Sequence, residues 1–182
     1  MPLPSFSAGD RVRPPLRADE ATTLRAFLDY HRDTLRWKCA GLNQEQLAQA
    51  MPPTDMALGG LMKHLALVES DWFEDTFAGG SPMSPFDTVD WEADPDWEWH
   101  TAPDDTPEEL FSLFDEAVRR ADAVIDKALA GPGLDADSQK TDHREGTPFS
   151  LRRILVHMIE EYARHNGHAD LIRQSIDGAT GE

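Results

Sequence analysis

The sequence contains very little cysteine and no long apolar run. Cys39 is its only cysteine, so an internal disulfide is excluded, and this usage suits a reducing cytoplasm. A membrane span needs a run of about 18 apolar residues, and the sequence has none. The first fifteen residues, MPLPSFSAGDRVRPP, lack the apolar core of a secretion signal. We therefore expect a cytoplasmic protein.

Basic side chains are also scarce. The 17 lysines and arginines stand against 34 aspartates and glutamates, which gives a formal net charge of −17. Nucleic acids and anionic membrane surfaces would repel such a chain at long range, and no basic cluster is large enough to overcome this repulsion. We therefore expect neither kind of partner. The hydrophobic share of 40% and the length of 182 residues favour one folded domain.

Hydrophobic residues at helical spacing predict four long helices. The predicted helices run from Asp19 to about Lys38, from Thr54 or Asp55 to about Phe77, from Thr106 to about 130, and from 147–150 to about Ile176. A shorter helix capped by Asn43 is expected over 43–51. The letters TPEE at 106–109 indicate a capping box with proline at the first helical position.

Residues 79–105 separate the second and third predicted helices. They hold four prolines and three tryptophans and show no regular period. Such a long loop is often a lid or a binding loop, although the tryptophans could equally fill the core. No convincing strand is visible anywhere. The sequence thus predicts an all-α four-helix bundle over 18–178, preceded by an irregular arm (1–17) and followed by a short tail (179–182).

The last predicted helix carries unusual polar groups on its inward face, in the stretch LVHMIEEYARHNGHADLIR (155–173). Glu161 and His165 are four residues apart and so share one face. His64 lies on the inward stripe of the second helix and could supply a third ligand. Two histidines and one glutamate with open positions are typical of catalytic metal sites. A surface ion pair and a hydrogen-bonded core histidine are the ordinary alternatives.

A second ligand assignment is also open at this point. His157 and Glu161 are likewise four residues apart, so a set of His64, His157 and Glu161 is stereochemically allowed. The neighbouring Glu160 points away by about 100° and is expected to pair with Arg164 at the surface.

The segments LGGLMKHLALVESDWF (58–73) and LRRILVHMIEEYARHNGHADLIRQSIDG (151–178) resemble the DinB-like superfamily. The nearest branch is an actinobacterial group without an assigned reaction, related to the mycothiol-dependent maleylpyruvate isomerases. The motif that carries the resemblance is a histidine, an acid and a histidine in steps of four, followed by a glycine two residues later. The resemblance implies a four-helix bundle that holds a divalent metal with three ligands.

The ligands that the resemblance implies are His64, Glu161 and His165. The last two match the Glu-x-x-x-His pattern of the isomerase branch, where most of the superfamily has His-x-x-x-His. His157 would support the ligands from one turn away. His168 stands where many relatives have glutamine, so the resemblance gives it no ligand role, although His157 and His168 both stay candidates for a supporting or alternative position.

The resemblance further implies a thiol-dependent transferase or isomerase. A low-molecular-weight thiol of the mycothiol type would react with a small electrophile as a metal-bound thiolate, because a coordinated thiol loses its proton. The same site could instead activate water for hydrolysis, or hold a metal without turnover in a binding or stress-related protein. Nitrogen and oxygen ligands suit zinc, nickel or iron. A homodimer is left open, and Cys39 is expected to be a buried, inert thiol.

Overall fold

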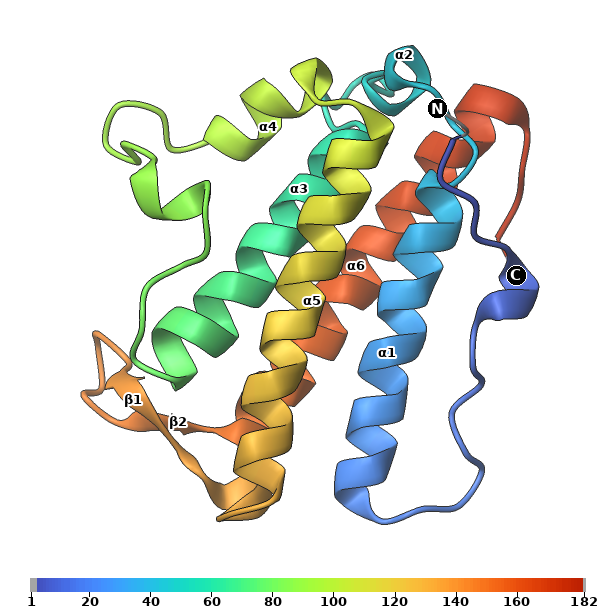
Figure 1. The fold of residues 1–182 in the computed structure, drawn as a ribbon. Coiled ribbons are helices and arrows are strands. Elements are labelled where there is room, and N and C mark those ends of the chain that lie inside the picture. Colours follow the sequence, from blue (N-terminus) through green and yellow to red (C-terminus); the bar gives the residue numbers. More distant parts are fainter. Residues whose placement is uncertain (1–2, 182) are drawn as a thin grey trace.

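A computed structural model describes residues 3–181, and this part of the chain is mostly helical, as the sequence predicts (Figure 1). Its long helices are α1 (Glu20–Cys39), α3 (Leu58–Glu69), α5 (Pro107–Leu129) and α6 (Leu151–Asp177). The shorter helical elements are α2 (Gln44–Leu47), α4 (Trp97–Thr101), 3-10 turns at Ala8–Asp10, Phe86–Thr88, Ala102–Asp104 and Gly133–Asp135, and a π-helix at Ser70–Phe77. In the described part of the chain, no helix combines the length and apolar character needed to cross a bilayer.

Helices α1, α5 and α6 each begin after a residue whose side chain accepts a hydrogen bond from a free backbone amide. The Asp19 carboxylate accepts the Thr22 amide at the start of α1. The predicted capping box of α5 is present, with Thr106 and Glu109 bonded reciprocally. After α1, Gly41 adopts a left-handed conformation with φ of +74°, which favours glycine because it has no Cβ.

The core lies between α1, α3, α5 and α6, which contact one another along their apolar faces. A buried polar cluster crosses this core. Arg32 of α1 forms two hydrogen bonds of 2.6 Å to Glu69 of α3, and Tyr162 of α6 donates to Glu69 at 2.7 Å. The cluster therefore links α1, α3 and α6 within the core, and removing one member of its buried ion pair would leave the other charge uncompensated.

The second long helix differs from the prediction at both ends. It begins at Leu58 rather than at Thr54 or Asp55, and the preceding Ala57 offers no side-chain cap. From Ser70 the regular helix continues as a π-helix to Phe77, close to the predicted end. The bond from the Ala78 amide to the Phe73 carbonyl, 3.0 Å long, has the spacing of five residues that defines this wider helix.

Two expectations about irregular segments are corrected. Residues 79–105 are not wholly irregular: α4 and two 3-10 turns lie within them, each too short to produce a readable period. The polar stretch after α5 contains β1 (Asp137–Thr141) and β2 (Pro148–Ser150), which pair antiparallel. The register shifts within this hairpin, and β1 is almost wholly exposed, so no alternation of apolar and polar residues marks it. The helix expected over 43–51 is shorter, at Gln44–Leu47, with the predicted Asn43 cap.

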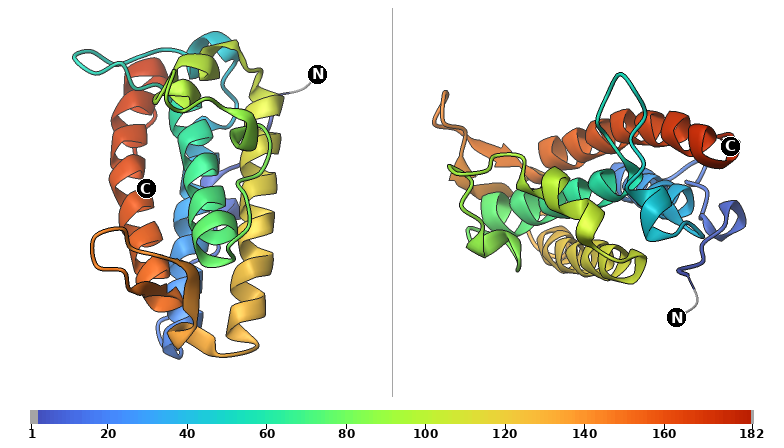
Figure 2. Two further views of the ribbon diagram at one scale, coloured as in Figure 1. Left: turned by 90° about the vertical axis from the view of Figure 1, so that its left-hand side faces the viewer. Right: turned by 90° about the horizontal axis from the view of Figure 1, so that it is seen from above.

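The segment 79–105 covers one side of α3 and brings α4 across the end of the molecule where α3 begins (Figures 1 and 2). The N-terminal arm runs beside α1, where the Arg11 guanidinium lies 4.4 Å from the centre of the Trp37 ring. The arrangement leaves α3 in contact with both α4 and α6, and the candidate site lies there.

Candidate metal centre

The three residues singled out in the sequence come together between α3 and α6. His64 projects from α3, and Glu161 and His165 project from α6. One ligand atom from each lies within 4.8 Å of the others. His165 Nε2 is 3.2 Å from Glu161 Oε1, and His64 Nε2 is 3.7 Å from the same oxygen. Both imidazoles therefore direct their Nε2 atoms at one carboxylate.

The chemistry of these donor atoms fits a divalent metal. Two imidazole nitrogens and one carboxylate oxygen form a three-ligand set of the kind found in catalytic zinc sites. The same donors are accepted by nickel and iron. The exposed fractions of the three side chains are 21% for His64, 18% for Glu161 and 11% for His165, so the cluster is shielded without being sealed. A bound ion would also neutralise the partly buried carboxylate.

Electrostatics favour the protonation state that a ligand needs. Burial is the largest cause that lowers the pKa of His165 below its usual value, and the neighbouring His64 lowers it further, while Glu161 acts in the opposite direction. Histidine binds metals in its neutral form. The lowered pKa of His165 therefore favours the neutral ring that can coordinate an ion.

Two further residues of the site come from α4, and the sequence patterns did not identify them. Glu98 is 4% exposed, and its Oε1 lies 2.9 Å from His64 Nδ1. Trp99 stacks on His64, with ring centroids 4.9 Å apart. A tryptophan-rich lid over residues 79–105 was one of two expectations for this segment. All three tryptophans of the segment pack against the core, as the other expectation had it, and Trp99 also covers one face of His64.

Gly60 explains how Trp99 comes so close. A Cβ at this position would lie 2.6 Å from Trp99 Cε3, a separation that real Cβ atoms essentially never show. The glycine in the first turn of α3 therefore lowers helix propensity but makes room for the indole ring. The two adjacent glycines at 59–60 are visible in the sequence, but the sequence does not show that Trp99 of α4 packs against Gly60.

The other candidate histidines of α6 lie beside the cluster. His157, which belonged to the alternative ligand set, packs against Trp72 with ring centroids 4.7 Å apart, and its Nδ1 is 3.6 Å from Glu160. His168 lies edge-on to His165 at 5.4 Å between ring centroids. The geometry thus groups His165, and not His157, with His64 and Glu161.

Several residues expected to lie outside the site have clear environments. Glu160 pairs with Arg164 at 2.7 Å, as predicted. Cys39 is fully buried, and burial raises the pKa of its thiol to about 12, which agrees with the expected inert thiol. His31 of α1 is half-buried against α6, where the Asn166 side-chain amide donates to the His31 backbone carbonyl at 3.0 Å.

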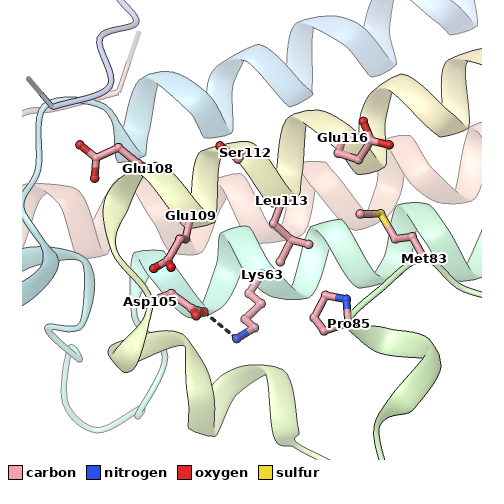
Figure 3. A pocket seen from close by; sticks show the side chains of 9 residues that line it. All are labelled: Lys63, Met83, Pro85, Asp105, Glu108, Glu109, Ser112, Leu113 and Glu116. Atoms are coloured by element: carbon pink, nitrogen blue, oxygen red, sulfur yellow. Dashed lines mark hydrogen bonds and ion pairs between the residues drawn. The ribbon is translucent and has the colours of Figure 1, made fainter. Parts of the chain in front are cut away.

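A separate cleft lies on another side of α3 and contains none of the three candidate ligands (Figure 3). It has a volume of about 510 Å³ and lies between α3, α5 and the segment that carries α4. Its polar lining is mainly acidic, and Lys63 reaches across it to Asp105 at 2.6 Å. This ion pair ties the segment before α5 to the helix that carries His64.

Comparison with known protein families places the chain in a family. The family model described as mycothiol-S-transferase matches residues 23–178. Because the match covers most of the chain, the protein belongs to this family. A comparison with curated proteins finds no match. The family is consistent with the DinB-like resemblance and with thiol-dependent transfer.

Proposed function

We propose that the protein is a metal-dependent thiol S-transferase that joins mycothiol to a small electrophile. The proposal rests on one observation above all: His64, Glu161 and His165 offer three ligand atoms within 4.8 Å of one another. The mycothiol-S-transferase family supports the choice of thiol. The four-helix bundle that the resemblance implies would supply the rigid frame, since bundle cores commonly hold metals on facing helices.

The protein's own side chains would perform distinct tasks. His64 and His165 would each bind the ion through Nε2, and Glu161 would bind it through a carboxylate oxygen. A divalent ion at this place would supply the positive charge that favours the thiolate form of the thiol. Three protein ligands would leave a bound ion open to the thiol, as in catalytic sites of this donor type. The reaction forms a bond between sulfur and an electrophilic carbon and breaks the bond from that carbon to its leaving group. An alkyl halide releases halide ion together with the thiol proton, whereas an epoxide opens and its ring oxygen takes up that proton to become a hydroxyl.

The walls of the site would limit access of water to the sulfur. Trp99 covers one face of His64, and Glu98 closes the side of the ring opposite to Glu161. Indole and imidazole surfaces favour a soft, weakly hydrated electrophile over a strongly charged one. We therefore expect neutral alkylating agents such as epoxides or alkyl halides to be better substrates than anionic ones.

The test is to measure metal content and mycothiol conjugation on the same protein samples, purified without chelators or a histidine tag. Wild type should contain about one divalent ion per chain and should consume mycothiol in the presence of an epoxide or alkyl halide. His64→Ala, Glu161→Gln and His165→Ala should each lose the metal and the activity together. Wild type without metal, even after zinc, nickel and iron are supplied, would reject the proposal.

Matched controls separate loss of the site from general damage. Glu160→Gln changes the neighbouring acid on α6 by the same chemistry, but Glu160 pairs with Arg164 at the surface. His100→Ala removes an exposed histidine that pairs with Asp94. Both variants should keep metal and activity. His157→Ala tests the alternative ligand set, which would be favoured by metal loss in this variant together with full metal in His165→Ala. Wild-type protein that contains the metal and hydrolyses the electrophile but does not transfer the thiol would favour the alternative function, a metal-dependent hydrolase.

A further inference from the structure

Glu98 has an environment that a surface or simple packing role does not explain. It lies on the five-residue helix α4 and is 4% exposed. One of its oxygens, Oε1, is 2.9 Å from His64 Nδ1. The other, Oε2, is buried and has no hydrogen-bond partner within residues 3–181. A buried carboxylate that is only half satisfied is costly, so its retention needs a compensating interaction.

The contact determines which nitrogen of His64 is free. A neutral imidazole carries one N–H, and a carboxylate accepts hydrogen bonds but cannot donate them when ionised. With an ionised Glu98 accepting at Nδ1, a neutral ring would carry its proton on Nδ1 and its lone pair on Nε2. That nitrogen is the one that faces Glu161, at 3.7 Å. The ring is thus prepared to coordinate an ion beside Glu161 before any ion arrives.

The position of α4 is itself fixed to α3 by contacts on either side of Glu98. Lys63, the residue before His64, donates to Thr101 at 2.8 Å and lies 4.4 Å from the centre of the Trp97 ring. Trp99 stacks on His64 and fills the space above Gly60. The residues on both sides of Glu98 therefore touch α3, and the carboxylate has little freedom to leave Nδ1.

We propose that Glu98 is a positioning residue that orients His64 and fixes its Nε2 as the metal-binding nitrogen. This inference rests on the proposed metal site. Carboxylates that accept the second N–H of a ligand histidine orient its ring and raise its basicity, and their loss typically weakens metal binding by 10–100-fold. The positive charge of a bound ion would also compensate the buried carboxylate of Glu98, whose Oε2 has no hydrogen-bond partner within the described residues. Residues 79–105 thus contribute to the metal centre from outside the long helices.

The test compares wild type with Glu98→Ala, Glu98→Gln and the control Glu92→Gln, which removes an exposed acid from the same segment. The first measurement is histidine ¹⁵N NMR on metal-free protein slightly above neutral pH. Wild type and Glu92→Gln should show His64 protonated on Nδ1 with a bare Nε2. In both Glu98 variants the Nε2-protonated form should increase, because neither alanine nor glutamine selects a proton on Nδ1.

The second measurement is the zinc dissociation constant of the same four proteins. It should rise about 10–100-fold in Glu98→Ala, and toward the lower end of that range in Glu98→Gln, which preserves packing. Unchanged tautomer and affinity in the Glu98 variants would overturn the inference. Should Glu98→Ala fail to fold, the nearly isosteric glutamine variant decides. Absence of zinc binding by wild type would reject the metal site itself, and the tautomer measurement would still decide whether Glu98 orients His64.

Discussion

Trp99 stacks on His64, with ring centroids 4.9 Å apart and ring planes 28° from parallel. The two residues belong to different helices and are separated by a long, proline-containing segment. Their contact is made within the space that Gly60 leaves open. The shape of the candidate metal centre therefore depends on a residue that carries no side chain.

Gly60→Ala should disturb the site from a distance. The new methyl group would meet the Trp99 ring at 2.6 Å, so the indole must shift away from His64. We expect a loss of about 1–3 kcal/mol in the free energy of unfolding, the usual cost of overpacking, together with weaker zinc binding. Urea unfolding and zinc titration measure the two effects.

Gly167→Ala is the matched control, because a Cβ on this α6 glycine would meet nothing within 4 Å. Alanine in an open helical position should instead stabilise the protein by about 0.5–1 kcal/mol. A lower free energy of unfolding for Gly60→Ala, together with a higher one for Gly167→Ala, would support a steric clash with Trp99 as the cause. Stabilisation by both would contradict it.

Glu69→Gln should be among the most destabilising conservative changes in the chain. Glu69 is fully buried and holds Arg32, which is 1% exposed, through two hydrogen bonds. Loss of the carboxylate charge leaves a buried guanidinium poorly compensated, which typically costs about 3–5 kcal/mol. Asp122 also contacts Arg32 at 2.8 Å, so we expect the lower end of that range from urea unfolding. Glu160→Gln, at an exposed pair, should change stability by less than about 1 kcal/mol.

Cys39 should resist alkylation in the folded protein. Burial raises the pKa of its thiol to about 12, and the thiolate is the reactive form. Iodoacetamide at neutral pH should label the native protein far more slowly than the urea-unfolded protein, as mass spectrometry will show. Equal labelling rates would mean that Cys39 is accessible, contrary to its buried position between α1 and the start of α3.

His31 should make stability fall under acidic conditions. Burial lowers its pKa in the folded state below the usual value of 6.5. Above that pH both folded and unfolded states hold a neutral ring, so there is no difference between them. As the pH falls through 6.5, the unfolded state takes up the proton first, and unfolding becomes easier until the folded-state pKa is passed. Urea unfolding from pH 8 to 5 should show a smaller loss of stability for His31→Gln than for wild type. An identical pH dependence of stability in the two proteins would contradict a lowered pKa of His31 in the folded state.

The long helices could be predicted from the sequence because each has a sustained apolar period and clear end signals, such as Thr106 with Glu109. The ligand cluster could be proposed for the same reason, since Glu161 and His165 lie one turn apart on a single helix. The spacing did not distinguish His165 from His157. That choice depends on how α6 is rotated against α3, which is a property of the packed core.

The hairpin and the contribution of α4 could not be predicted. Strand β1 is short, polar and irregular in register, so it lacks the alternation that identifies a strand. Glu98 resembles any acid of an acidic loop until α4 is placed against α3. The π-helix was also invisible, because the change from four-residue to five-residue hydrogen bonding leaves no composition signal.

The most direct measurement is anomalous X-ray diffraction from crystals of the zinc-loaded protein, with data collected on both sides of the zinc absorption edge. We predict one strong anomalous peak per chain, bonded to His64 Nε2, His165 Nε2 and a Glu161 oxygen, with Glu98 still hydrogen-bonded to His64 Nδ1. A peak coordinated by His157 in place of His165, or no peak between α3 and α6, would contradict the metal centre proposed for this protein.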